Sequence, residues 1–143
     1  MSEPLAVIER LAAAQNAHDI DAMVACFAED YESEQPAHPD RAFRGSAQVR
    51  ANWSEIFAGV PDLRAELLRS AVDGETVWTE WRYTGTQEGG GRFDVAGVII
   101  AGVRDDRIAR ARLYLEPIDD AGAGIEDAVH EWSGGADLRP AKP

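Results

Sequence analysis

Residues 63–116 decide the fold of this chain, and they read LRAELLRSAVDGETVWTEWRYTGTQEGGGRFDVAGVIIAGVRDDRIARARLYLE. Apolar and polar residues alternate along the segment, and β-branched and aromatic residues stand between turn signals, as in half-buried strands. The alternation predicts four long strands, at residues 63–72, 76–86, 93–103 and 108–116. Because the intervening turns are short, neighbouring strands are expected to pair antiparallel as a meander.

The turns in this segment are marked by residues that tolerate tight bends. Asp73-Gly74 is a two-residue hairpin signal, the glycines at 89–91 end the second strand, and Asp105-Asp106 separates the third strand from the fourth. Gly97 and Gly102 lie inside the third strand, where glycine indicates a bulge or strong curvature. We therefore expect a bent sheet that wraps around a cavity.

Apolar residues in the first part of the chain recur at helical spacing instead. Three helices are expected there, at residues 2–16, 20–27 and 46–58. Ser2 and Asp19 are suited to cap the first two, and Ser46 opens the third. The second helix is expected to include Phe27, which follows Ile20 at i+7.

The remaining segments are short. A strand is expected at 30–35, followed by an irregular loop at 36–45 that prolines punctuate. Beyond the last long strand, residues 124–132 are expected to form one more short helix. A single domain therefore covers residues 1–132, and the Gly- and Pro-containing segment 133–143 is predicted to be a flexible tail.

The chain of 143 residues is strongly acidic, with 26 acidic against 14 basic side chains and a net charge of −12. Such a charge repels phosphate backbones and anionic bilayers, so neither nucleic acid nor a membrane is an expected partner. No apolar run approaches the roughly 20 residues that span a bilayer, and residues 1–10 have no long apolar core. A cytoplasmic protein is expected. The single cysteine, Cys26, excludes an internal disulfide.

Several short motifs, in this order and spacing, resemble the polyketide cyclase (SnoaL)-like branch of the nuclear transport factor 2-like superfamily. They are NAHDIDA at 16–22, FAED at 27–30, Arg44-Gly45, Pro61-Asp62-Leu63, Trp81 before Thr84-Gly85-Thr86, and Asp106-Arg107-Ile108 before Tyr114. The resemblance implies an α+β cone in which three N-terminal helices pack on a curved, mostly antiparallel sheet, commonly dimeric through the sheet. It does not give the function, because the superfamily includes isomerases, hydrolases, cyclases, transport factors and binding modules.

The enzymes that this chain resembles carry acids and bases where this sequence has neutral residues. Leu11 and Gln35 stand where ketosteroid isomerases have a tyrosine and an aspartate, and Ile99 and Leu113 where polyketide cyclases have a histidine and an aspartate. Leucine has no proton to donate, and a glutamine amide is not a base near pH 7. The resemblance thus implies a site without the usual acid–base groups.

Alternation along the second long strand places Trp81 and Tyr83 on the concave face, with Glu80 and Arg82 on the outer face. Trp81 and Tyr83 stand where limonene-epoxide hydrolases, by resemblance, carry an arginine and an aspartate. An aromatic and aliphatic pocket with a few hydroxyl and amide groups suits a hydrophobic small molecule. The expected ligand-binding residues are Tyr31, Gln35, Trp53, Phe57, Trp81, Tyr83, Val95, Ile99 and Leu113. The alternative is that these aromatic side chains simply fill a core.

His38 is the candidate catalytic residue. It lies between Pro36 and Pro39 and close to Asp40, and a histidine near an acid can act as a base around neutral pH. The alternative is an exposed loop histidine. The histidines are dispersed and there is no thiolate cluster, so neither a metal nor another cofactor is expected.

Two functions stay open at this point. The first is a module that binds a small hydrophobic or aromatic metabolite without strong acid–base groups. The second is an isomerase, lyase or cyclase that acts on a polyketide-like or ketone substrate through His38 and the pocket tyrosines. A third reading is a scaffold whose cavity is filled by its own side chains. The expected assembly is a homodimer through the outer face of the sheet, which presents Val77 or Trp78 together with Glu80, Arg82, Arg110, Arg112 and Tyr114.

Overall fold

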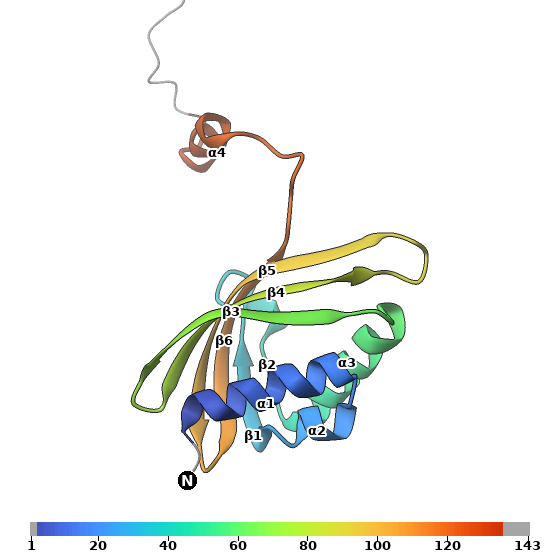
Figure 1. Ribbon diagram of the computed structural model, residues 1–143. Coiled ribbons are helices and arrows are strands. Elements are labelled where there is room, and N and C mark those ends of the chain that lie inside the picture. The colour runs from blue at the N-terminus through green and yellow to red at the C-terminus, as the bar shows by residue number, and fades with distance from the viewer. Residues whose placement is uncertain (1–2, 136–143) are drawn as a thin grey trace, which may run out of the picture.

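The structure, a computed structural model, describes residues 3–135 as a bent sheet with three helices packed on one side and a fourth set apart (Figure 1). The helices are α1 (Pro4–Ala17), α2 (Ile20–Val24), α3 (Ser46–Gly59) and α4 (Ile125–Trp132). The strands are β1 (Phe27–Glu34), β2 (Phe43–Arg44), β3 (Arg64–Asp73), β4 (Thr76–Thr86), β5 (Arg92–Arg104) and β6 (Arg107–Pro117). The predicted α+β class is confirmed.

The six strands form one sheet in the order β2-β1-β6-β5-β4-β3. Strands β3 to β6 pair antiparallel with their sequence neighbours, so the predicted meander is confirmed. β1 runs parallel to β6 and antiparallel to β2. A parallel pair needs a long crossover between its strands, and α3 with the first three strands of the meander supplies it. The described sheet is therefore mostly antiparallel, as expected.

The second helix is shorter than predicted. α2 ends at Val24, and Phe27 opens β1 instead of continuing the helix. Asp19 caps α2 as expected, because its side chain accepts a hydrogen bond from the backbone N–H of Ala22 at 3.1 Å. Phe27 lies opposite Ile108 on β6 and its ring is buried. Pairing with the sheet thus overrides the helical spacing, since a helix of one or two turns has little stability of its own.

The segment predicted as an irregular loop contains two short elements. Residues Pro39–Arg41 form a single 3-10 turn, and Phe43 and Arg44 form β2 on the edge of the sheet. β1 begins three residues before the predicted strand at 30–35. A strand of two residues is too short to leave an alternating pattern in a sequence, so periodicity cannot find it.

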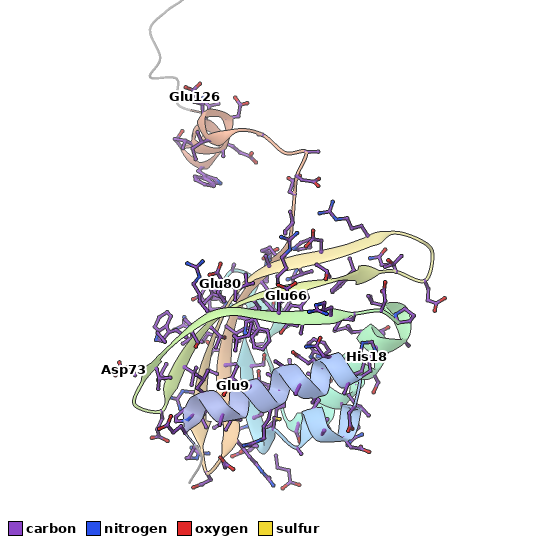
Figure 2. All side chains as sticks on the ribbon, in the orientation of Figure 1. Glu9, His18, Glu66, Asp73, Glu80 and Glu126 are labelled. Carbon is purple, nitrogen blue, oxygen red and sulfur yellow. The ribbon has the colours of Figure 1, made fainter. Side chains whose placement is uncertain are left out.

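The side chains of β4 alternate between the two faces of the sheet, as predicted. Trp81 and Tyr83 lie on the concave face, under the helices, and are only 1% and 3% exposed. Glu80 lies on the opposite face, where the Arg69 guanidinium contacts its carboxylate at 3.0 Å. Figure 2 shows Glu66 and Glu80 on the side of the sheet away from α1. The strand phase required by the expected pocket is therefore confirmed.

An ion-pair cluster links two strands on the outer face. Asp94 on β5, whose side chain is 7% exposed, accepts two hydrogen bonds from Arg82 on β4, at 2.9 and 2.8 Å, and one from Arg92. The hydrogen bonds from Arg82 and then Arg92 lower the pKa of Asp94 from 3.8 to about 2. Trp78 and Tyr114, also on the outer face, are 49% and 40% exposed, whereas Val77, the alternative to Trp78, is buried. The homodimer through this face stays a prediction.

α4 stands apart from the sheet at the end of an extended segment (Figure 1). It confirms the predicted helix at 124–132 to within one residue, and Ile125, Val129 and Trp132 on it are exposed. Ser2, the predicted first cap, and residues 136–143 of the predicted tail lie outside the described residues. Among residues 3–135 no helix is long and apolar enough to cross a membrane.

Glycine is required where β5 passes between its neighbours. Gly97 lies opposite Trp81 on β4 and Leu115 on β6, with a φ of 153° that favours glycine. A Cβ atom built there would lie 1.9 Å from the carbonyl oxygen of Tyr114. The register also shifts after Gly102, which is the bulge predicted for the third long strand. Both glycines thus accompany the bend of the sheet.

Replacing Gly97 with alanine should destabilise the fold by about 3 kcal/mol or more, because the methyl group meets backbone that cannot move aside without breaking strand pairing. Urea unfolding of the purified protein measures the change. The matched control is Gly59→Ala at the end of α3, where an added Cβ meets nothing within 4 Å. That variant should change the free energy of unfolding by less than about 1 kcal/mol. Equal effects at both positions would contradict the close approach at Gly97.

Candidate functional site

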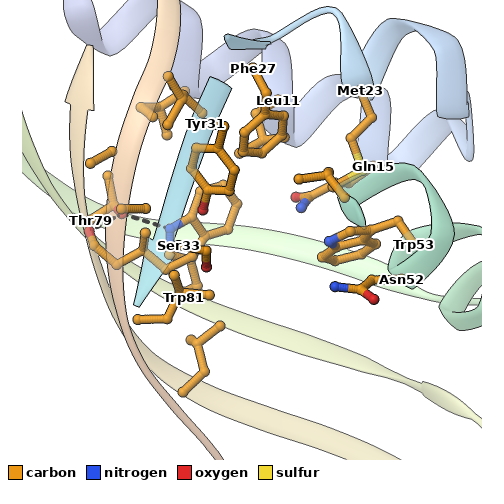
Figure 3. A pocket seen from close by; sticks show the side chains of 18 of the residues that line it. Leu11, Gln15, Met23, Phe27, Tyr31, Ser33, Asn52, Trp53, Thr79 and Trp81 are labelled. Atoms are coloured by element: carbon orange, nitrogen blue, oxygen red, sulfur yellow. Dashed lines mark hydrogen bonds between the residues drawn. The ribbon is translucent and has the colours of Figure 1, made fainter. Parts of the chain in front are cut away.

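A cavity of about 240 Å³ lies between the helices and the concave face of the sheet (Figure 3). Its apolar wall consists of Ile8, Leu11, Met23, Phe27, Phe43, Val49, Trp53, Ile56, Trp81, Ile99, Ala101, Ile108, Ala111, Leu113 and Leu115. Its neutral polar groups are Gln15, Tyr31, Ser33, Gln35, Asn52, Thr79 and Tyr83. The helices contribute one side of this wall, and the alternating inward positions of β1, β4, β5 and β6 contribute the other.

The described lining contains no aspartate, glutamate, histidine, lysine or arginine. Leu11, Gln35, Ile99 and Leu113, the positions at which the resemblance implied that this chain lacks acids and bases, all lie in the wall. Thr79, Ile99 and Leu113 face one another across β4, β5 and β6, which shows that these positions share the concave face. The site therefore offers hydrogen bonds and apolar contacts but no charged group.

Three aromatic rings pack against one another in the wall. Trp81 and Tyr83 are stacked, with ring centroids 5.5 Å apart and planes 7° from parallel, and Trp53 on α3 lies 5.8 Å from Tyr83 at 54°. The indole N–H of Trp81 donates to the Thr79 hydroxyl at 2.7 Å (dashed line in Figure 3), and that hydroxyl donates to the Ile99 carbonyl at 2.7 Å. These bonds hold the Trp81 ring in place, so a flat apolar surface is preformed.

The two tyrosines of the pocket stay protonated at neutral pH. Burial raises the pKa of Tyr31 to about 12, and the nearby Ser33 hydroxyl opposes this rise only in part. Burial also raises the pKa of Tyr83, and the hydrogen bond with Gln15 opposes that rise. Neither phenol is therefore a base in this site, although both can form hydrogen bonds through the intact hydroxyl.

Gln15 is a polar residue of the cavity that the sequence analysis missed. Its side chain is 1% exposed, and its Nε2 donates to the Tyr83 hydroxyl at a long 3.4 Å. Its carbonyl oxygen, Oε1, is buried with no hydrogen-bond partner among the described residues. The available signal was its position, because residue 15 follows Ile8 at i+7 and Leu11 at i+4 on the apolar face of the first helix.

The structure brings together seven of the nine residues expected to bind ligand. Lining the cavity are Tyr31, Gln35, Trp53, Trp81, Tyr83, Ile99 and Leu113. Phe57 packs outside this wall, where its ring stacks on His18 at 4.6 Å, and Val95 lies beyond Gly97 along β5. That these seven bind a ligand stays a prediction.

The candidate catalytic residue, His38, lies outside the cavity wall. Its ring Nε2 contacts the Glu116 carboxylate, and the two side chains are 38% and 53% exposed. The connection to the cavity is Gln35, which lines the wall and lies three residues earlier; its backbone carbonyl accepts a hydrogen bond from the His38 N–H at 2.7 Å. Within residues 3–135, no three side chains of the His, Cys, Asp and Glu types gather to hold a metal ion.

The raised pKa of Tyr31 predicts a loss of stability in alkali. Its phenol ionises near pH 10 when the chain is unfolded but only near pH 12 in the fold, so the stability it contributes is complete below pH 10 and is lost as the pH rises through 12. The free energy of unfolding should therefore fall across this window, and it should fall less steeply in Tyr31→Phe. Urea unfolding at several alkaline pH values measures both slopes; identical slopes would show that Tyr31 is not buried.

Solved structures share this fold at low sequence identity. IdmH, a candidate polyketide cyclase from Streptomyces antibioticus, is 22% identical, with 80% of this chain and 93% of that chain covered and a TM-score of 0.70. A candidate ketosteroid isomerase from Kribbella flavida is 19% identical, with 97% and 91% covered and a TM-score of 0.68. An NTF2-like protein of unknown function from Cytophaga hutchinsonii is 11% identical, with 82% and 93% covered and a TM-score of 0.63. The predicted nuclear transport factor 2-like fold is confirmed.

A comparison with curated proteins found no match. The family model of the SnoaL-like domain matches residues 8–111. This segment spans more than half of the chain and includes the whole cavity wall except Leu113 and Leu115. The resemblance inferred from the sequence motifs is thereby confirmed: the chain belongs to the SnoaL-like domain family.

Proposed function

We propose that this protein binds a small, neutral, largely aromatic molecule in the cavity between its helices and its sheet. The observation that supports this function is the chemistry of the wall, in which the described residues provide apolar side chains, amides and hydroxyls but no charge. A ligand that carried a charge would lose its hydration without gaining a counter-ion, at a cost of several kcal/mol or more. A neutral ligand avoids that cost.

The aromatic character of the ligand follows from the shape of the wall. The parallel rings of Trp81 and Tyr83 and the tilted ring of Trp53 offer flat surfaces against which another ring can pack. The cavity, at about 240 Å³, is smaller than the roughly 300–1,000 Å³ typical of drug-sized ligands. A molecule with a single ring or two fused rings therefore suits the cavity better than a four-ring steroid.

Binding of 2-naphthol, measured by isothermal titration calorimetry, tests this function. The wild type should bind it with a dissociation constant on the order of 100 μM, as expected for a ligand of about a dozen heavy atoms. Leu113→Trp should weaken binding at least about tenfold, because the larger ring occupies the cavity beside Ile99.

The matched control is Tyr114→Trp, which enlarges the next side chain of the same strand on the outer face. It should keep the wild-type affinity. Loss of binding in both variants, or in neither, would place the ligand outside the cavity. If the ligand binds in the cavity, native mass spectrometry of freshly purified protein should show a natural ligand as an added mass that is present in Tyr114→Trp and missing in Leu113→Trp.

A second candidate function is an isomerase, lyase or cyclase reaction on a ketone or polyketide-like substrate. The contact between His38 and Glu116 favours it, because a histidine held by a carboxylate is oriented for proton transfer. The similarity to IdmH, a candidate polyketide cyclase, points the same way. In such a reaction the neutral phenols of Tyr31 and Tyr83 would donate hydrogen bonds to a substrate carbonyl, and His38 would move the proton.

The two functions differ in what His38 does. The test follows, by NMR, the exchange of the α-protons of a β-diketone such as benzoylacetone with deuterium. If the protein only binds, the exchange should proceed at the uncatalysed rate with both the wild type and His38→Ala. His38→Ala should also keep the affinity for 2-naphthol, since His38 lies outside the cavity wall. Exchange that the wild type accelerates and the variant does not would replace binding by catalysis as the function.

A further inference from the structure

The polar pair at the inner wall of the cavity, Gln15 and Tyr83, has unused hydrogen-bonding capacity. Gln15 Oε1 is buried and has no partner among the described residues. Tyr83 accepts from Gln15 Nε2, and no acceptor for its own O–H is found among residues 3–135. Both side chains line the cavity, and Figure 3 shows the Gln15 amide pointing from α1 toward the inside of the ring of lining residues.

A buried carbonyl that stays unpaired at this place lowers the stability of the fold. Leaving a buried acceptor unpaired costs about 1–3 kcal/mol, and buried polar groups in native proteins nearly always have a partner. The neighbouring positions on the same helix face, Ile8 and Leu11, are apolar. An apolar residue at position 15 would satisfy the core better, so the amide is best explained by a group that reaches it when the cavity is filled.

We propose that Gln15 and Tyr83 form a subsite for a hydroxyl group of the ligand, whose O–H donates to Gln15 Oε1 while its oxygen accepts from the Tyr83 O–H. This inference rests on the proposed binding function and names the ligand class within it: a neutral hydroxylated aromatic, such as a phenol or an enol on a small ring system. A ketone or an ether would accept from Tyr83 but leave the glutamine carbonyl unpaired. A carboxylate would find no cation in the described wall.

Two probes, 2-naphthol and 2-methoxynaphthalene, test the subsite. They share the naphthalene ring system, but only 2-naphthol has a hydroxyl that can donate a hydrogen bond. Calorimetry on the wild type should show 2-naphthol bound about tenfold more tightly, as expected for one buried neutral hydrogen bond. In Gln15→Met, a side chain of similar length without the amide, this preference should shrink to about twofold or less. The change should come from weaker binding of 2-naphthol.

The matched control is Gln87→Met, the same substitution at an exposed position of the turn between β4 and β5, outside the wall. It should keep both affinities and their ratio. Tyr83→Phe is a second variant that keeps the ring but removes the O–H. It should weaken both probes by a similar factor and leave their ratio near the wild-type value, because both probe oxygens accept from the Tyr83 O–H. Thermal unfolding without probe should give Gln15→Met a Tm at or above that of the wild type, because the unpaired carbonyl is gone.

The probe affinities and the Tm values together decide between a hydroxyl subsite and a structural role for Gln15. A preference for 2-naphthol that Gln15→Met loses and Tyr83→Phe keeps, with both probes weakened in Tyr83→Phe, supports the hydroxyl subsite. Equal binding of the two probes to the wild type, or a preference that persists in Gln15→Met, overturns the subsite but leaves the binding function in place. A Tm of Gln15→Met well below that of the wild type, with an unchanged probe ratio, assigns Gln15 a purely structural role. Failure of both probes to bind the wild type overturns the binding function and the subsite with it.

Discussion

The phase of β4 within the sheet is the constraint on which the rest of the structure depends. Over its length this strand is paired on one side with β3 and on the other with β5, so it cannot slip without breaking both ladders. A slip of one residue would exchange the two faces and bring Glu80 and Arg82 into the cavity. The observed register instead places Thr79, Trp81 and Tyr83 in the cavity, and the cavity wall is uncharged for that reason.

The two faces of the sheet divide the chemistry of the chain between them. Charged groups pair on the outer face, as Arg82 and Arg92 do with Asp94 and Arg69 with Glu80. The concave face keeps hydroxyls, amides and rings. With a net charge of −12, the protein also repels anions before they reach the cavity. The net charge and the wall therefore both disfavour an anionic ligand, in line with the proposed neutral one.

Strand alternation allowed the sequence to predict most of the sheet side of the cavity. It placed Trp81, Tyr83, Ile99 and Leu113 correctly, since side chains two apart share a face wherever the ladder is regular. It could not say how far along a strand the cavity extends. Val95 has the same phase as Ile99 but lies past Gly97, outside the wall.

The helical side was harder to predict, because helix spacing says which face is buried but not what it is buried against. Phe57 follows Trp53 at i+4, yet its ring stacks on His18 and not on the cavity. Phe27 fits a helical pattern that pairing with β6 overrides. Gln15 was passed over because a glutamine is read as solvent-facing even at a position whose spacing belongs to the core.

That glutamine also bears on the question whether the cavity is a site or only an incompletely filled core. A core filled by its own side chains is improved by pairing every buried polar atom or by replacing it with an apolar one. Here the fold does neither: Oε1 of Gln15 stays unpaired beside a phenol whose O–H also has no acceptor in residues 3–135. Positions where local rules of stability are broken without visible compensation tend to be positions that serve function. The aromatic rings of Trp81 and Trp53 alone fit either reading, whereas the unpaired carbonyl among them favours a ligand.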